Sequence, residues 1–239
     1  MERETLQEER RQHLARFYLL LDRLKERQGG ARRLSDCTGR MHWPRRGIYF
    51  FTEVGEDRSE SGVGPRVVRV GTHALTSGSK STLWGRLAQH KGQANGGGNH
   101  RGSIFRLIVG TAAIKRDTLT YPSWGHGSTA ARDIRQGEIV LERMVSTIIG
   151  AMPFLTLAID DQPSPESLRG YIERNSIALL SNYEKTPLDP PSAQWLGHLC
   201  DRPKVRGSGL WNSNHVDEKY DPAFLDALER LICSRDASS

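Results

Sequence analysis

Three short β-forming segments stand far apart in a chain that is otherwise rich in helical patterns. Residues 46–54 consist largely of Ile, Tyr, Phe, Thr and Val, and residues 66–71 read RVVRVG, in which Val67 and Arg69 would share one face. A third run, 153–159, reads PFLTLAI and precedes two aspartates. With so few strands the sheet must be small. The sequence predicts an α+β fold with a small three-stranded, mainly antiparallel sheet flanked by helices.

Helical periodicity accounts for most of the remaining chain. Leucines at roughly helical spacing predict a first helix that stops at Gly29-Gly30. Ser164, followed by a proline, has the pattern of an N-cap with proline in the first turn. The expected helices are 2–28, one capped by Ser81, 103–116, 131–149, one from Ser164 to Leu180, and one opening at Asp221-Pro222.

These elements predict three parts of the chain. An N-terminal amphipathic helix occupies 1–30, a central domain occupies 46–183 with a helical insertion at 92–150, and an extension at 184–239 ends in a helix. The apolar runs are too short to span a membrane, and the first thirty residues lack a signal-peptide pattern. Three scattered cysteines exclude a disulfide framework. A cytoplasmic protein is expected.

The positive charge of the chain is concentrated in one block. Its formal net charge is +6, and residues 61–116 carry nine basic residues and no acidic one. Surfaces exposed only to solvent usually mix both signs, so this block indicates a polyanionic partner such as DNA. The residues expected to bind nucleic acid are Arg66, Lys80, Lys91, Arg101 and Arg106.

Two strand-end tripeptides frame a candidate site. Gly47-Ile48-Tyr49 opens the first strand, and Arg69-Val70-Gly71 closes the second. The glycines would let a ligand approach the backbone closely. A tyrosine in a strand also follows from β-propensity alone, so both interpretations stay open at this point.

Three helical positions carry further candidate chemistry. Arg86 and His90 are spaced i, i+4, so both side chains could reach one phosphate from one helical face. Glu173 falls between Ile177 and Leu180 on its helix, and a carboxylate beside an apolar face is costly unless it is paired or binds a metal. Asn182 closes the same helix, which is a common position for asparagine.

Taken in order, these residues resemble the GIY-YIG nuclease family. The first motif matches at Gly47-Ile48-Tyr49, whereas the second matches partly, because Arg69 stands where the family has tyrosine. The helical arginine corresponds to Arg86, and the metal-binding glutamate and the late asparagine correspond to Glu173 and Asn182. His90 resembles the histidine of restriction-enzyme members.

The resemblance implies a DNA endonuclease that uses Mg²⁺ or Mn²⁺, with a role in restriction of foreign DNA. Tyr49 would act as general base, Arg86 would hold a nonbridging phosphate oxygen, and Glu173 would hold the metal. A free phenol has a pKa of about 10, so the tyrosine would need adjacent positive charge. His90 would orient the water or move a proton. A homodimer is expected if both strands of a symmetric site are cut.

Alternatives remain at this stage. Glu142, on a preceding helix, is the second candidate for the metal ligand. A DNA-binding module without catalysis is the alternative function, because the second-motif tyrosine is missing. A nucleotide-binding loop at Gly71–Ser81 is disfavoured, because Ser79 separates Gly78 from Lys80 and breaks the required spacing.

Overall fold

The computed structural model describes residues 2–93 and 95–233 and contains a four-stranded antiparallel sheet in the order β1-β4-β2-β3. The predicted strands are β2 (Gly47–Asp57), β3 (Pro65–Gly71) and β4 (Pro153–Ala158). The prediction of three strands was wrong by one, because β1 (Arg32–Arg33) pairs with β4. Two exposed arginines carry no alternating pattern, so the sequence gives no signal for this strand.

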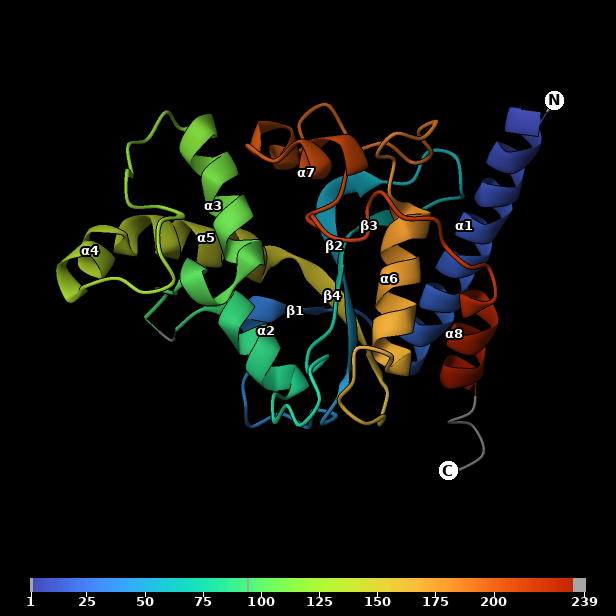
Figure 1. Cartoon of the computed structure of the whole chain (residues 1–239), viewed down its shortest axis with the longest axis horizontal. Helices are drawn as coiled ribbons and strands as arrows, with labels where there is room; N and C mark the ends of the chain where they lie inside the picture. Colours follow the sequence, from blue (N-terminus) through green and yellow to red (C-terminus); the bar gives the residue numbers. More distant parts are fainter. Residues whose placement is uncertain (1, 94, 234–239) are drawn as a thin grey trace.

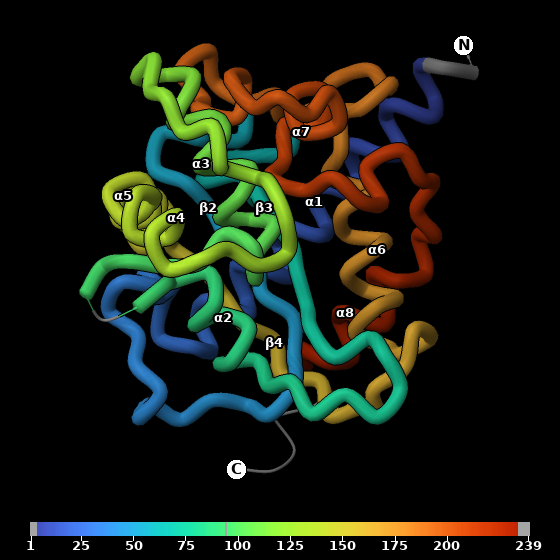
Figure 2. Tube along the Cα trace, turned by 60° about the vertical axis from the view of Figure 1, so that its left-hand side comes forward, coloured from blue at the N-terminus to red at the C-terminus, as the bar shows by residue number. Residues whose placement is uncertain are grey.

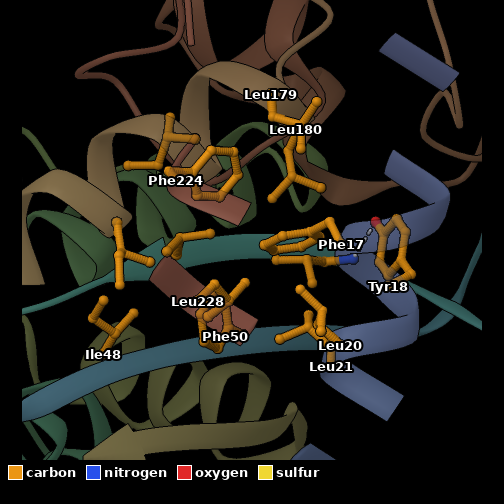
Figure 3. Close-up of a cluster of buried hydrophobic side chains, with 14 of the residues drawn as sticks. Phe17, Tyr18, Leu20, Leu21, Ile48, Phe50, Leu179, Leu180, Phe224 and Leu228 are labelled. Atoms are coloured by element: carbon orange, nitrogen blue, oxygen red, sulfur yellow. Dashed lines mark hydrogen bonds between the residues drawn. The ribbon is translucent and has the colours of Figure 1, made fainter. Parts of the chain in front are cut away.

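Alternation along β2 divides the interior between the two faces of the sheet. Ile48 and Phe50 pack on one face, where α1 (Glu2–Arg27), α6 (Leu168–Leu180) and α8 (Phe224–Cys233) cover the sheet (Figure 3). Tyr49 and Phe51 pack on the other face. That face is covered by α2 (Leu83–Lys91), α3 (Ile104–Arg116) and α5 (Ile139–Ala151) (Figure 1). The chain therefore forms a three-layer arrangement with the sheet in the middle.

A bulge interrupts the alternation that the sequence predicted for β3. Phe51 pairs with Arg69 but Thr52 pairs with Val67, so Val68 is the extra residue. Val67 consequently packs with the α1 layer, whereas Arg69 lies over Phe105 in the α2 layer. The predicted shared face of Val67 and Arg69 was wrong.

The helices follow the predictions with three local differences. The segment 131–149 forms two helices, α4 (Arg132–Gly137) and α5, because Glu138 turns inward to accept hydrogen bonds from Arg101 and Ser123. The helix expected from Ser164 begins later, with Ser167 as the N-cap of α6. Thr82, rather than Ser81, caps α2. No helix in the described part of the chain could cross a membrane.

The segment after α6 returns to the sheet and covers its open edge. It contains the short helices η3 (Leu196–Leu199) and α7 (Pro203–Ser208), which lie above the sheet in Figures 1 and 2. The Trp211 N–H donates to the carbonyl of Val68 at 2.7 Å. The side-chain amide of Asn212 donates to the Val70 carbonyl at 2.9 Å and accepts from the Val70 N–H at 3.1 Å. The free side of β3 is thus paired by the C-terminal segment.

Candidate active site

A pocket of about 200 Å³ opens at the edge of β3, where the two helical layers meet. Glu173 and Ile177 enter it from α6 on one side of the sheet, and Arg86 enters it from α2 on the other. Arg69 of β3 lies between them. The C-terminal segment completes the wall with Trp211, Asn212 and His215. Residues that lie more than 140 positions apart in the sequence therefore share one cavity.

Tyr49 and His90 form a hydrogen-bonded pair on the α2 side of the sheet. The Tyr49 hydroxyl lies 2.8 Å from His90 Nε2, and His90 Nδ1 lies 2.8 Å from the Ser103 hydroxyl oxygen. Both aromatic residues are buried. In the tautomer with its hydrogen on Nδ1, His90 donates to Ser103 and presents Nε2 as an acceptor for the Tyr49 proton. The hydrogen bond to His90 therefore fixes the orientation of the Tyr49 hydroxyl.

The protein environment keeps His90 uncharged. Burial, followed by the positive charges of Arg69, Arg86 and Arg106, holds the pKa of His90 well below its ordinary value. The predicted common phosphate contact of Arg86 and His90 is therefore wrong for this arrangement. The two side chains are one helical turn apart, but Arg86 reaches the pocket while His90 lies beneath it against Tyr49.

Gly71 lets the tyrosine reach its partner. A Cβ atom placed on Gly71 would lie 2.3 Å from the Tyr49 hydroxyl oxygen, much closer than any carbon–oxygen contact permits. Gly71 and Tyr49 are direct partners across the β2–β3 pair. Only glycine leaves the Tyr49 ring in this position, which is the physical reason for glycine at the end of the second motif.

Arg69 occupies the position where the family pattern has tyrosine. Its guanidinium lies 4.5 Å from the Phe105 ring centroid and donates to the Trp211 carbonyl through Nη1. Its Nε has no hydrogen-bond partner among the described residues. Burial lowers the pKa of Arg69, and the nearby Tyr49 opposes this effect. Arg69 thus supplies a buried cation with spare donor capacity at the pocket wall.

Glu173 is a half-buried carboxylate in the same pocket. Its Oε1 accepts a hydrogen bond from the Thr72 N–H at 3.0 Å. Burial raises the pKa of Glu173, although that hydrogen bond and the charges of Arg69 and His215 act in the opposite direction. Within residues 2–93 and 95–233 no ion pair is found for this half-buried carboxylate, and a carboxylate with a shifted pKa in a pocket is a common feature of functional sites.

Glu142, the alternative metal ligand, is saturated by protein partners. Arg106 binds Glu142 Oε2 through Nε at 2.9 Å and through Nη2 at 2.5 Å. The N–H and ring of His100 bind Oε1 at 2.6 and 2.9 Å. Burial opposes ionisation, but the hydrogen bonds from His100 and Arg106 outweigh it and lower the pKa of Glu142. This carboxylate holds α3 against α5 and has no capacity left for a metal.

Asn182 lies away from the pocket. Its Oδ1 accepts from Arg10 at 2.9 Å and from the Leu188 N–H at 3.0 Å, and its Nδ2 donates to the Leu188 carbonyl. Asn182 stands nine positions after Glu173, or about 13 Å farther along the helix axis. The structure therefore does not bring it together with Glu173, and Asn182 instead anchors the turn that follows α6.

Three of the five basic residues expected to bind DNA are buried in ion pairs. Arg66 pairs with Glu56 at 2.5 Å, Arg101 with Glu138 at 2.6 Å, and Arg106 with Glu142. Each carboxylate belongs to sequence outside the acid-free block. These three arginines are therefore not free to bind phosphate, whereas DNA binding by the other basic residues of 61–116 stays a prediction.

Lys80 and Lys91 keep surface access. Lys80 is exposed, and Lys91 is half-buried while donating to the carbonyls of Ser35 and Cys37. The sequence analysis missed two residues near the site. Ser103 orients the His90 ring, and Asn212 covers the edge of β3. Neither stands in a motif, so no local signal could have identified them.

Comparison with known proteins agrees with this geometry. Residues 8–238 match the family described as GIY-YIG domain. No curated protein and no solved structure matches the chain. The family match spans nearly the whole chain and includes Tyr49, Arg86 and Glu173, which converge on one edge of the sheet. This chain therefore belongs to the GIY-YIG nuclease family.

Proposed function

We propose that the protein is a divalent-metal-dependent DNA endonuclease. The observation that carries this proposal is a pocket at the β3 edge lined by Glu173, Arg69 and Arg86, with the hydrogen-bonded Tyr49–His90 pair beside Arg69. Phosphodiester hydrolysis requires a proton acceptor for water, a cation beside the phosphate and help for the leaving oxygen. These groups come from different helical layers, so folding of the whole sheet is needed to assemble them.

In this mechanism Tyr49 would act as a phenolate beside the Arg69 cation, and its oxygen would take a proton from the attacking water while the neutral His90 ring holds that oxygen through Nε2. Ser103 fixes the His90 ring through Nδ1. Arg86 offers its guanidinium to a nonbridging oxygen of the phosphate as a planar donor. Its present partners, Gln89 Oε1 and the Gly102 carbonyl, are exposed contacts that a phosphate can replace.

The residues fit a magnesium site in which the protein supplies one carboxylate and the substrate and water supply the other ligands. Among residues 2–93 and 95–233, no group of three or more His, Cys, Asp or Glu side chains is placed to enclose a metal. Mg²⁺ commonly binds through one or two carboxylates together with waters and substrate phosphates. Glu173 would hold Mg²⁺ or Mn²⁺ in this way, and the ion would supply charge neutralisation at the phosphate.

Two observations favour the alternative of a DNA-binding module without catalysis. Tyr49 is only 1% exposed, and Arg69 replaces the tyrosine of the second motif. A general base must reach its water, so full burial argues against turnover in this conformation. Such a module would retain DNA in a gel shift and never nick it.

The test is nicking of supercoiled plasmid in Mg²⁺ or Mn²⁺ by the wild type and by Glu173→Gln. We expect the variant to lose cleavage and retain DNA affinity. Because burial disfavours the ionised carboxylate, and glutamine can still accept from Thr72, the variant should be at least as stable as the wild type at neutral pH. Glu166→Gln, an exposed change just before α6, is the matched control and should cleave normally.

Retained nicking by Glu173→Gln would refute the assignment of the metal ligand. Binding without nicking by the wild type would favour the silent module. The restriction role rests on the resemblance of Arg86 and His90 to restriction-enzyme members, and a homodimer is proposed only for cleavage of both strands. Linear product formed without accumulation of nicked plasmid would support paired active sites.

A further inference from the structure

The segment 37–46 lies along α2, the helix that carries Arg86. The Leu83 N–H at the start of α2 donates to the Arg45 carbonyl at 3.0 Å. At the other end of α2, the Lys91 ammonium donates to the carbonyl of Cys37 at 2.5 Å. The two ends of the segment are therefore tied to the two ends of α2.

Aromatic packing fixes the middle of this segment. The rings of Trp43 and Trp84 are stacked with centroids 4.9 Å apart. The Trp43 indole N–H donates to the Thr38 carbonyl at 2.9 Å and closes the loop on itself. A Cβ atom on Gly39 would lie 2.7 Å from Trp84 Nε1, so glycine allows the close approach. The segment and α2 therefore form one preorganised surface.

This surface brings together two acid-free stretches of the sequence. No acidic residue occurs from 37 to 52 or from 61 to 116. Arg40, Arg45 and Lys80 are exposed, and no ion pair joins them to a carboxylate within the described residues. They differ in this respect from Arg66, Arg101 and Arg106, whose charges are neutralised internally. Basic residues whose charge is not neutralised inside the protein are thus present on this face.

We propose that the face formed by segment 37–46 and α2 binds the phosphate backbone of duplex DNA next to the cleaved bond. The proposal rests on the proposed nuclease function and identifies where the DNA lies. A nine-residue helix is about 13 Å long, and one DNA strand carries a phosphate about every 3.4 Å along the axis. The face can therefore meet about four successive phosphates, with Arg86 at the pocket and Arg40, Arg45 and Lys80 on its flank.

The test compares the Arg40→Gln/Arg45→Gln double variant with Lys25→Gln/Arg230→Gln. The control removes the same charge from exposed positions on α1 and α8, which cover the opposite face of the sheet. Affinity for a fluorescent 30-bp duplex is measured by anisotropy in EDTA over a range of salt concentrations. Each lost phosphate contact reduces the slope of log affinity against log salt by about 0.9, so the double variant should lose about 1.8. The control should keep the wild-type slope.

Cleavage measurements separate this proposal from the nuclease assignment. At saturating DNA, the Lys25→Gln/Arg230→Gln control should nick at the wild-type rate, because neither residue lies at the pocket or on the proposed face. Lys80→Gln gives a second test, with an expected slope loss of about 0.9. An unchanged slope in both variants, or an equal loss in the control, would refute the proposed DNA-binding face. Normal nicking by the wild type would in that case leave the nuclease function intact. A reduced slope in a protein that never nicks would support the surface and refute the nuclease.

Discussion

Replacement of Tyr49 by phenylalanine separates catalysis from packing. The change deletes one hydroxyl together with its 2.8 Å contact with His90 Nε2, and it leaves the aromatic ring in place. It leaves a buried imidazole nitrogen without a partner, which costs about 1–3 kcal/mol of unfolding free energy. For a chain of this size the melting temperature should fall by roughly 2–4 °C per kcal/mol. The protein should therefore remain folded at 25 °C.

The expected loss of activity is much larger. A general base contributes about 10²–10⁴-fold in rate, which corresponds to roughly 3–5 kcal/mol in the barrier. The assay is single-turnover nicking of supercoiled plasmid with enzyme in excess, together with anisotropy to confirm that DNA binding is unchanged. A drop of two or more orders of magnitude in the nicking rate, with a modest change in melting temperature, supports the role of Tyr49.

The chain contains a matched control for this experiment. The Tyr220 hydroxyl lies 2.9 Å from His13 Nδ1, and the two rings meet edge to face with centroids 5.7 Å apart. The Tyr49 and His90 rings have nearly the same arrangement, at 5.5 Å. Tyr220→Phe thus deletes an equivalent hydroxyl away from the pocket and should nick at the wild-type rate. Equal nicking rates for the two phenylalanine variants would refute the argument for Tyr49.

Three further perturbations test the surroundings of the site. Gly71→Ala should displace the Tyr49 ring and reduce nicking about as much as Tyr49→Phe, and a fully active variant in the same plasmid assay would contradict the close contact. Glu142→Gln should cost about 3–5 kcal/mol in urea unfolding, because it leaves the buried Arg106 guanidinium with an uncompensated charge; a loss below 1 kcal/mol would speak against this ion pair. Burial, followed by the charge of Arg169, lowers the pKa of His73 to about 4, so the folded protein excludes a proton that the unfolded chain binds below about pH 6.5. Stability should therefore fall as the pH drops from about 6.5 to about 4, and urea unfolding of His73→Gln at pH 7 and pH 5 should show a smaller fall than the wild type.

Local patterns in the sequence predicted the parts of the site that stand at fixed places on strands and helices. Tyr49 is the third residue of β2, Gly71 ends β3 and Glu173 lies within α6, so each position follows from periodicity and strand limits. Arg86 follows from its place on α2, one turn before His90. The depth of a side chain within a helical face does not follow from spacing, which is why His90 was expected at the surface.

Long-range pairing could not be predicted from one sequence. The acid-free block was interpreted as an open surface because its carboxylate partners, Glu138 and Glu142, stand 36 or 37 residues away from Arg101 and Arg106. The strand β1 has only two residues and no hydrophobic pattern. Asn182 was assigned from its position after α6, whereas the tertiary fold uses it to hold Arg10.

The amide of Asn212 acts on β3 as a substitute for one peptide unit of a neighbouring strand. It gives and receives one hydrogen bond with Val70, as a backbone partner would in an antiparallel ladder. A single side chain can satisfy these groups without offering a further row of donors and acceptors to another molecule, so the sheet ends here instead of inviting self-association through its edge. Removal of the chain from Trp211 onward would expose that edge and would also open the pocket wall. Resistance to aggregation and the integrity of the site therefore depend on the same short stretch of polypeptide.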